Sequence, residues 1–586
     1  MFLPLSKKDL TKRGWDDVDV VLVTGDAYVD HPSYGVAVIG RVLEGAGLRV
    51  AMMAQPDWRS ADPFKEFGRP RLFFGVTAGN LDSMVANYTA HKKTRKRDEY
   101  SPGGKPGLRP DRAVIVYCNR IREAFGDIPI VLGGIEASLR RIAHYDWWGD
   151  SVRRSILLDA RADILVYGMG ERQVTEIAKR LRKGKDLSGI RGTALVGNDL
   201  PEGALEIPSF EEVRENGSKF NQAFRLFFEN GTTCDGPAVA QRHGNRYVIQ
   251  YPPPKPLSPS ELDRVFELPY ERNPHPVYEA LGGIPGFETV RFSLISNRGC
   301  CGDCSFCSLS LHQGKVIQSR SIESVTREAR LISERPDFKG TITDVGGPTA
   351  NLYGAACGRA EGPCSQRSCM VPTRCRNFRT GYRRSLDLYR ALRGIPRVKH
   401  VFIESGIRYD LLTEKEDRPF LAELCLHHVS GQMKVAPEHT QNFVVQLMNK
   451  PPIEVYERFE GAFNEVNQRL PKKRYLVRYL ISSHPGATLD DALQMALYFK
   501  KRHIHPEQVQ DFMPLPLTRS TCMYHTGRDP FTGAQVYVAR SFRERKMQRA
   551  LLQWWSPQNK VLVKEALRLL ERRDLWQEFK GGKSSR

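Results

Sequence analysis

Short apolar runs separated by helical patterns fill the first 200 residues. The runs are apolar at consecutive positions, which is typical of strands buried on both faces of a parallel sheet. Segments with helical spacing lie between several of them, such as YGVAVIGRVLEGAG. This alternation predicts a doubly wound α/β domain over residues 1–200. The predicted strands are 18–26, 49–55, 71–77, 128–134, 163–170 and 193–198.

Two segments break this pattern. Residues 91–110, HKKTRKRDEYSPGGKPGLRP, are rich in Lys and Arg, and their glycines and prolines predict a mobile surface segment. Residues 201–287 have no clear period and include the Pro-rich stretch YPPPKPLSPSELD. We expect them to form a connecting segment that is partly extended.

A second alternating series follows over residues 288–517. Its helical patterns include 321–334 and 489–501. Repeated βα units build a parallel sheet or barrel, with the chemistry at the carboxyl ends of the strands. A basic C-terminal extension is expected over 518–586. The predicted strands are 290–296, 340–347, 399–406, 432–438, 474–486 and 509–516.

Charge and composition narrow the class of protein. The chain of 586 residues has 88 Lys and Arg against 67 Asp and Glu, a formal net charge of +21. From Val536 to Arg586 there are 13 basic and 5 acidic residues. This excess is compatible with a nucleic-acid partner, but it also favours simple solubility. The sequence has neither an apolar run long enough to span a membrane nor a secretory signal, so we expect a cytoplasmic protein.

Cysteine usage indicates metal binding. Eight of the 12 cysteines lie between Cys300 and Cys375. The reducing cytosol argues against disulfides, and a dense cluster in a large chain is typical of metal ligands.

The stretch SNRGCCGDCSFCSL holds four of these cysteines and follows the first strand of the second series. Cys301, Cys304 and Cys307 fit the start of a bacterial ferredoxin run, C-x2-C-x2-C-x3-C-P. That run requires a further Cys at position 311 followed by Pro. Leu311 and His312 occupy these positions, so the ferredoxin interpretation fails.

Cys300, Cys304 and Cys307 fit a different spacing, C-x3-C-x2-C, with Phe306 before the last cysteine. Three thiolates on a four-iron cluster leave one iron open, as catalytic metal sites do. S-Adenosylmethionine (SAM) can chelate such an iron and be cleaved reductively. Cys301 is then left over as a small, partly buried residue. Structural zinc and inert thiols are the alternatives.

Several further stretches resemble the YgiQ-type family of radical SAM proteins over nearly the whole chain. They include GGIEASLRRIAHYDWWGDSVRRSILLDARADILVYGMGE, DVGGPTANLYG, IESGIRYDLL, VAPEHT and ISSHPGAT. The resemblance implies a partial (β/α)6 radical SAM barrel after a flavodoxin-like or cobalamin-binding-like domain. It also implies a [4Fe-4S] cluster, SAM, and an electron donor such as flavodoxin or ferredoxin. It does not supply a substrate.

The resemblance also assigns individual residues to the cluster and to SAM. It puts the cluster on Cys300, Cys304 and Cys307. A glycine pair that holds the methionine amino group of SAM corresponds to Gly346-Gly347, although Pro348 replaces the usual acidic residue. Ser405-Gly406, at the end of the third strand, would approach the SAM ribose. Ordinary tight turns are the alternative for both glycine sites.

A second cysteine set lies in a Cys-rich insertion, 352–378. Four thiolates suffice for a closed zinc site or a fully ligated iron–sulfur cluster, although no C-x2-C pair is present. The alternative is reduced cysteines in a long loop. The second cysteine set is Cys357, Cys364, Cys369 and Cys375.

Other signals carry less weight. Asp30-His31 lacks the D-x-H-x-x-G spacing of a cobalamin site, so we do not expect cobalamin. Trp147-Trp148 is more typical of buried aromatic packing than of base stacking. The histidines at 312, 439 and 484 and Glu438 lie near predicted strand ends, where each either lines a pocket or satisfies a local hydrogen bond.

The sequence therefore predicts a radical SAM enzyme with an unidentified substrate. One alternative is an RNA-modifying, methylthiotransferase-like enzyme. The stretch QSRS and a basic C-terminal helix favour it, with Leu562, Ala566, Leu569 and Leu570 on one face. Another is a non-catalytic iron–sulfur protein that carries electrons or senses redox state. An open iron that binds SAM distinguishes the enzyme from the carrier.

Overall fold

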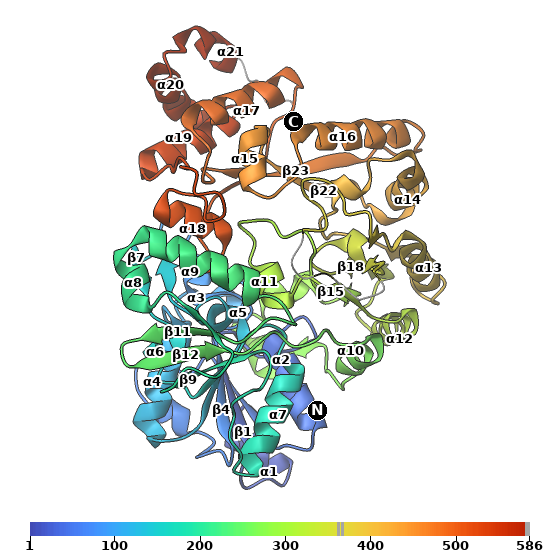
Figure 1. Cartoon of the computed structure of the whole chain (residues 1–586). Helices are drawn as coiled ribbons and strands as arrows, with labels where there is room; N and C mark the ends of the chain where they lie inside the picture. The colour runs from blue at the N-terminus through green and yellow to red at the C-terminus, as the bar shows by residue number, and fades with distance from the viewer. Residues whose placement is uncertain (360–363, 365–367, 581–586) are drawn as a thin grey trace. The chain divides into compact units, whose positions relative to one another are not determined.

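The chain folds into two compact units. The computed structural model describes residues 1–359, 364 and 368–580. Unit 1 contains Met1–Arg298 and Ser308–Arg335, and unit 2 contains Gly299–Cys307 and Pro336–Arg586 (Figure 1). The cysteine-rich stretch at 299–307 therefore belongs to unit 2, although the residues on both sides of it belong to unit 1.

A nine-stranded sheet forms the centre of unit 1, in the order β10-β11-β12-β9-β8-β5-β4-β1-β3. Five of its strands are parallel neighbours. Counted along the chain, their spatial order is 2-1-3-4-5, the order of flavodoxin-type doubly wound sheets. These strands are β1 (Val20–Thr24), β3 (Val50–Ala54), β4 (Phe73–Thr77), β5 (Ile130–Leu132) and β8 (Ile164–Val166).

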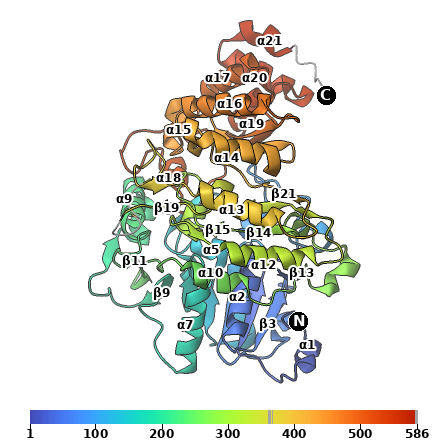
Figure 2. The same ribbon diagram turned by 90° about the vertical axis from the view of Figure 1, so that its right-hand side faces the viewer.

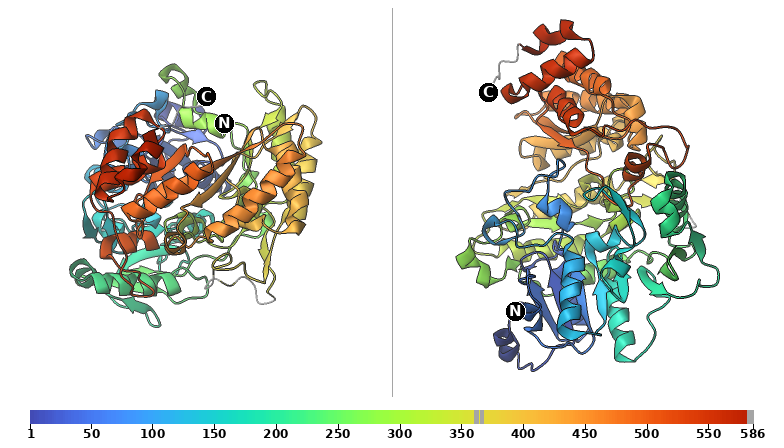
Figure 3. Two further views of the ribbon diagram at one scale, coloured as in Figure 1. Left: turned by 90° about the horizontal axis from the view of Figure 1, so that it is seen from above. Right: turned by 90° about the vertical axis from the view of Figure 1, so that its left-hand side faces the viewer.

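Alternate residues of the central strands pack against opposite layers of helices. Val20 and Leu22 share one core with α2 (Gly35–Gly45) and α7 (Glu171–Arg182). The intervening positions share another with α4 (Ala113–Phe125). Figure 2 shows α2 and α7 side by side on their face of the sheet, and the right-hand view of Figure 3 shows the opposite face. Both faces are covered, which explains the continuous apolar runs.

The rest of this sheet differs from the sequence prediction. β9 (Thr193–Gly197) is antiparallel to β8, so the prediction of a sixth parallel strand is wrong. β10 (Leu205–Ile207), β11 (Val239–His243) and β12 (Arg246–Gln250) extend the same sheet. Much of the segment 201–287, expected to be a connector, therefore belongs to unit 1. Its helices are α8 (Phe210–Glu215), α9 (Gly217–Asn230) and α10 (Pro259–Phe266).

Parallel strands in chain order form the framework of unit 2. β17 (Thr341–Ile342) pairs with β21 (His400–Val401), and β22 (Gln432–Glu438) pairs with β23 (Tyr475–Ser482). A bridge between residues 407 and 435 links the two pairs, and β24 (Gln508–Asp511) follows β23. Each strand thus neighbours the next in sequence, as repeated βα units require. The predicted strand at 340–347 divides into β17 and β18, which covers Asp344–Gly346.

Helices connect these strands and complete the C-terminal part. The outer ones are α13 (Tyr382–Arg393), α14 (Arg418–Glu423), α16 (Ile453–Gln468) and α17 (Leu489–Lys501). The C-terminal part contributes α18 (Arg519–Thr526), α19 (Phe542–Leu552), α20 (Lys560–Leu569) and α21 (Trp576–Lys580).

The C-terminal helices share a hydrophobic core with α17 and β23. In α20 the buried side chains are Val563, Ala566 and Leu567, whereas Leu569 is 55 % exposed. The apolar face predicted from the sequence is therefore wrong at Leu569. The predicted fold class is confirmed: an N-terminal doubly wound domain, a βα series and a helical C-terminal extension. In the described part of the chain, no helix combines the length and apolar character needed to cross a membrane.

Candidate functional site

The cysteine loop, Gly299–Cys307, presents three partly exposed cysteines and one buried one. Cys300, Cys304 and Cys307 are partly exposed, whereas Cys301 is 5 % exposed. The Cys307 amide donates to the Cys304 carbonyl at 3.0 Å, which makes a tight turn between these two residues. The partly exposed cysteines are therefore those of the C-x3-C-x2-C spacing.

A buried arginine lies against this loop. Nε and Nη2 of Arg408 donate to Asp410 at 3.1 and 2.6 Å. Asn351 fixes the Arg408 backbone, accepting from its amide at 2.9 Å and donating to its carbonyl at 3.0 Å. A Cβ atom at Gly302 would overlap Nη1 of Arg408 and would lie 3.4 Å from Sγ of Cys300. Glycine at 302 therefore lets a positive charge approach Cys300 closely.

A second buried cation faces the same loop. Nζ of Lys450 lies 3.7 Å from Glu438, and their side chains are 8 % and 10 % exposed. Burial raises the pKa of Glu438 to about 7, and the charge of Lys450 opposes that rise. Burial also raises the pKa of the Cys304 thiol, and the positive charges of Lys450 and Arg408 oppose this effect. Both cations therefore favour a thiolate at Cys304.

The residues before Lys450 hold the backbone of the cysteine loop. The Ser305 amide donates to the Met448 carbonyl at 2.9 Å. The side-chain amide of Asn449 donates to the Asp303 carbonyl at 2.8 Å. Sequence reasoning did not identify Arg408, Lys450 or Asn449, because only the folded chain brings them to the loop.

The residues assigned to SAM by resemblance occupy neighbouring strand ends in unit 2. Asp344 accepts hydrogen bonds from the amides of Glu404 and Ser405 at 2.8 and 3.0 Å, and from the Ser405 hydroxyl. A Cβ atom at Gly346 would lie 2.7 Å from Oγ of Ser405. The Gly406 carbonyl accepts from the amide of residue 350 at 3.1 Å. Gly346 and Ser405 are thus in contact, and this contact alone excludes a side chain at Gly346.

The remaining assigned residues are adjacent to this contact in sequence. Gly347 directly follows β18. Burial raises the pKa of Asp344, while its hydrogen bonds from Ser405 lower it.

The second cysteine set lies partly in β19 (Ala356–Cys357), which pairs with β20 (Phe378–Arg379). The Cys375 amide donates to the Cys369 carbonyl at 2.9 Å. Cys369 also lies near Cys301, whose pKa is raised by burial and further by Cys369. Residues 360–363 and 365–367 of the predicted insertion lie outside the described part of the chain.

Within the described ranges of the chain, neither cysteine set is arranged as the ligands of a single metal ion. Among the described residues, no three His, Cys, Asp or Glu side chains are arranged as the ligands of one ion. The thiolates that hold a cubane cluster each bind a different iron, so they are spaced more widely than the ligands of one ion. The three partly exposed thiols, the neighbouring cations and the tight turn fit a cluster better than a mononuclear zinc.

A buried ion pair fills the switch point of the unit 1 sheet, where doubly wound folds bind ligands. Arg109 is 1 % exposed; its Nε donates to the Gly25 carbonyl at 3.0 Å, and its Nη2 lies 2.6 Å from Asp26. A Cβ atom at Gly25 would lie 2.9 Å from Nε of Arg109, and one at Gly79 would overlap Asp26. The prediction that residues 91–110 form a mobile surface segment is therefore wrong at Arg109.

His31 is fixed at the same edge of unit 1. It is 1 % exposed, and its Nδ1 accepts from the Ser33 amide at 3.1 Å. Its Nε2 lies 3.3 Å from Nη1 of Arg272. Burial lowers the pKa of His31 well below its usual value.

The histidines expected near strand ends make local contacts. In unit 1, Nδ1 of His312 lies 3.0 Å from the Ser138 hydroxyl. In unit 2, Nδ1 of His439 accepts from the amide of residue 441 at 3.1 Å. Trp147 is buried at 2 % exposure, as expected for packing rather than base stacking.

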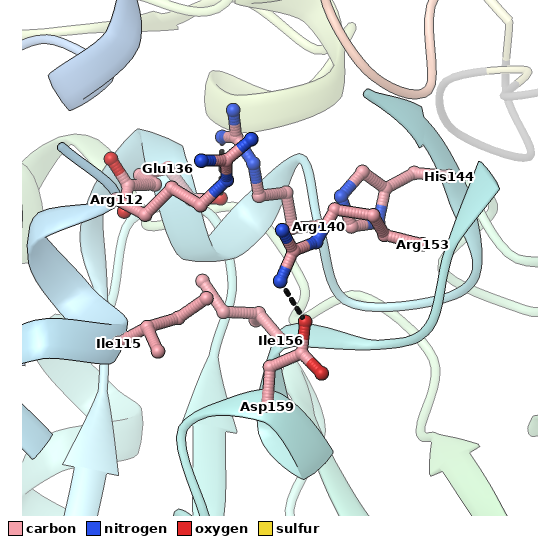
Figure 4. A pocket seen from close by; sticks show the side chains of 8 residues that line it. All are labelled: Arg112, Ile115, Glu136, Arg140, His144, Arg153, Ile156 and Asp159. Carbon is pink, nitrogen blue, oxygen red and sulfur yellow. Dashed lines mark hydrogen bonds and ion pairs between the residues drawn. The ribbon is translucent and has the colours of Figure 1, made fainter. Parts of the chain in front are cut away.

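Unit 1 also contains a small polar cavity, shown in Figure 4. Its volume is about 10 Å³, which is room for about one water molecule. Nη2 of Arg140 and Nε2 of His144 are buried without a hydrogen-bond partner there. The cavity is too small for an organic cofactor. It is lined by Arg112, Ile115, Glu136, Arg140, His144, Arg153, Ile156 and Asp159.

Comparisons with known proteins define the family. A family model described as "Radical SAM N-terminal" matches residues 2–293, and a "Domain of unknown function (DUF3362)" matches residues 507–580. A UPF0313 protein of Clostridium botulinum (strain 657 / Type Ba4) is 51 % identical over 581 residues, covering 98 % of this chain and 91 % of that protein. The chain belongs to the UPF0313 family. The UPF0313 protein of Methanosarcina acetivorans is 50 % identical over 606 residues, covering 98 % of this chain and 81 % of that one.

Two solved structures align with most of this UPF0313 chain at low sequence identity. The structure of the "Cobalamin-dependent S-adenosylmethionine radical enzyme OxsB" with aqua-cobalamin bound aligns with a TM-score of 0.51 at 9 % identity, covering 97 % of this chain and 77 % of that one. The radical SAM methyltransferase TsrM of Kitasatospora setae aligns with a TM-score of 0.49 at 16 % identity, covering 86 % of this chain and 73 % of that one. The likeness to OxsB shows that this UPF0313 chain shares its overall fold with that protein.

Cobalamin does not fit unit 1 of this UPF0313 chain. Arg109 and Asp26 occupy the switch point where a cofactor would enter. Both ring nitrogens of His31 face other groups of the protein, so His31 offers no free ligand for cobalt. The adjacent Asp30 forms a fully buried ion pair with Arg41.

Proposed function

We propose that the protein is a cytoplasmic radical SAM enzyme in which Cys300, Cys304 and Cys307 bind a [4Fe-4S] cluster. The observation that carries the proposal is the pair of buried cations at the cysteine loop. Thiolate ligands bring negative charge into the protein, and buried charge requires a partner. Arg408 and Lys450 supply it without contributing ligands themselves.

A [4Fe-4S] cluster held by Cys300, Cys304 and Cys307 would supply the electron for reductive cleavage of the sulfonium C–S bond of SAM. Gly346 and Gly347 would hold the amino group of SAM, and Ser405 and Gly406 would approach its ribose. An electron donor such as flavodoxin or ferredoxin would reduce the protein. The substrate that loses a hydrogen atom is unidentified.

The test is anaerobic reconstitution with iron and sulfide, followed by incubation with SAM and dithionite. We expect slow formation of 5′-deoxyadenosine without any substrate. Alanine at position 300, 304 or 307 should abolish it, whereas Cys301→Ala, the matched control within the same loop, should retain it. Activity in Cys300→Ala with loss in Cys301→Ala would reverse the ligand assignment. A reducible cluster that never cleaves SAM would favour the electron carrier.

The QSRS stretch that favoured an RNA-modifying enzyme has a structural role, whereas the basic C-terminal side chain of Arg572 is exposed. Arg320 of the QSRS stretch is fully buried in unit 1, where it forms an ion pair with Glu328 and donates to Ser324 at 2.8 Å. At the C-terminus, Trp554 is buried in the helical core and Arg572 lies 3.1 Å from Asp574. RNA therefore remains a substrate class to be tested rather than the leading proposal.

The second cysteine set would bind a second iron–sulfur cluster or a zinc ion. Support comes from the density of thiols and from the neighbouring positions of Cys369 and Cys375. A second cluster near Cys301 would carry electrons or bind substrate.

A further inference from the structure

The region that matches the domain of unknown function touches the cysteine loop. Ser520 is the second residue of α18 in this region. Its amide donates to the Ser305 carbonyl at 2.9 Å, and the two hydroxyl oxygens lie 2.8 Å apart. Ser305 is the residue between Cys304 and Phe306. The C-terminal region thus reaches the backbone between two of the proposed cluster ligands.

His484 extends this contact into a directed chain of hydrogen bonds. Its Nδ1 lies 2.8 Å from the Pro485 carbonyl, and its Nε2 lies 2.6 Å from the Ser520 hydroxyl. Burial lowers the pKa of His484 to about 3, so the ring is neutral at physiological pH. A carbonyl only accepts, so Nδ1 carries the proton and Nε2 accepts from Ser520. The Ser520 oxygen then accepts from the Ser305 hydroxyl.

The chain is closed to water and has apolar support. His484 and Ser520 are 0 % exposed and Ser305 is 6 % exposed. The ring of Phe306 stands edge-on to His484, with centroids 6.0 Å apart, and packs against Met448 and two other apolar residues. A buried polar chain of this kind fixes one geometry, because each broken link leaves a desolvated group unpaired.

We propose that the region 507–580 has a positioning function. Through Ser520, and with His484 behind it, this region fixes the Ser305–Phe306 backbone and so sets the separation of Cys304 and Cys307 for the cluster. The inference rests on the proposed function. It assigns a role to a region that would otherwise be read as a basic extension.

The same region provides a matched control. Gln548 in α19 is also 0 % exposed, accepts from the Ser483 amide at 3.1 Å and donates to the Ala487 carbonyl at 3.0 Å. It therefore joins the region to the loop that carries His484, and its hydrogen bonds among the described residues do not reach the cysteine loop itself. Gln548→Ala should weaken the packing of the region while keeping the direct Ser520–Ser305 link, so it separates the effect of that link from general loosening.

The experiment uses the full chain, reconstituted anaerobically. Visible absorption follows cluster loss after addition of an iron chelator, and electron paramagnetic resonance (EPR) records the reduced cluster. We expect Ser520→Ala to lose its cluster about ten-fold faster than the wild type, a factor typical of one lost buried hydrogen bond, and to show an altered EPR signal. Ser520→Thr, which keeps a hydroxyl, should restore both properties. Gln548→Ala, which keeps the Ser520–Ser305 link, should lie much closer to the wild type than Ser520→Ala in both.

A second variant guards against misfolding of Ser520→Ala. Ser305→Ala removes the same link from the loop side, and the double variant should be no worse than either single variant if the two serines act as one link. Cluster loss at the wild-type rate in Ser520→Ala and Ser305→Ala would overturn the inference alone. A wild-type protein that binds no [4Fe-4S] cluster would overturn the proposed function and this inference with it.

Discussion

The ion pair of Arg408 and Asp410 offers a quantitative test of how the cysteine loop is supported. Both side chains are almost fully buried, at 8 % and 7 % exposure, and two hydrogen bonds join them. Three variants separate the charges: Arg408→Gln, Asp410→Asn and the double variant. The first leaves a carboxylate alone in the interior, the second leaves a guanidinium alone, and the third leaves two neutral amides.

The expected energies follow from burial. Removing one partner of a buried ion pair costs about 3–5 kcal/mol, because the other charge loses its compensation. The double variant loses only hydrogen bonds between groups that still pair with each other, so we expect a cost of about 1–2 kcal/mol. The single variants should therefore be less stable than the double variant, which is opposite to additive behaviour.

Hydrogen exchange measures the free energy of local opening around the ion pair. A local measurement suits a chain of two units, because the units need not unfold together. In the protein without cluster, peptides covering residues 400–412 should exchange about 100- to 4,000-fold faster in Arg408→Gln than in the wild type, since 1.4 kcal/mol is a factor of ten. The control is Arg502→Gln, whose ion pair with Glu457 is 34 % and 36 % exposed. An exposed pair contributes at most about 1 kcal/mol. If the double variant exchanges as fast as Arg408→Gln, the uncompensated charge is not the cause.

Three further predictions address metal, pH and RNA. In a variant with alanine at positions 300, 304 and 307, the second cysteine set should still bind iron with sulfide, or zinc; a folded protein without metal would reduce it to plain thiols. His243 is buried in unit 1 and burial lowers its pKa to about 4 from 6.5, so the unfolded state binds the extra proton as the pH falls from 6.5 to 4. The contribution of His243 to the unfolding free energy of unit 1 should fall by about 3 kcal/mol over this range, and calorimetry should show a correspondingly smaller fall in His243→Phe than in the wild type. Reversing the C-terminal arginines at 568, 572 and 573 to Glu should flatten the salt dependence of RNA binding, measured by filter binding, if RNA is the substrate; no wild-type binding at low salt would remove RNA as a candidate.

Local patterns were enough to predict the strands but not all of their directions. The runs at β1, β3, β4, β5 and β8 are apolar on both faces, and their burial confirms that interpretation. β9 has a similar run, yet it pairs antiparallel with β8 and also with β12, a strand from the segment expected to be a connector. Hydrophobic periodicity reveals neither the direction of a strand nor its distant partner.

The cysteine spacing could be read from the sequence because its ligands lie within eight positions of one another. The groups that support these cysteines could not be predicted from the sequence. Arg408, Lys450 and Ser520 are distant from the loop in sequence and carry no motif that predicts their contact with it. The prediction of a surface position failed at Arg109. Its Gly- and Pro-rich surroundings are typical of a surface loop, but Arg109 lies in the interior, where Asp26 neutralises its charge.

These contacts divide the chemistry between the units. In unit 1 the residues at the ligand-binding edge of the sheet pair with one another: Arg109 with Asp26, and His31 with Arg272. A site whose polar groups are already satisfied gains little from a ligand that must displace them. In unit 2 the cations at the cysteine loop are paired as well, Arg408 with Asp410 and Lys450 with Glu438, but the thiols that they face become thiolates once they bind metal and can use that positive charge. The thiols, rather than unpaired charges, are therefore the reason to expect the ligand chemistry of this chain in unit 2.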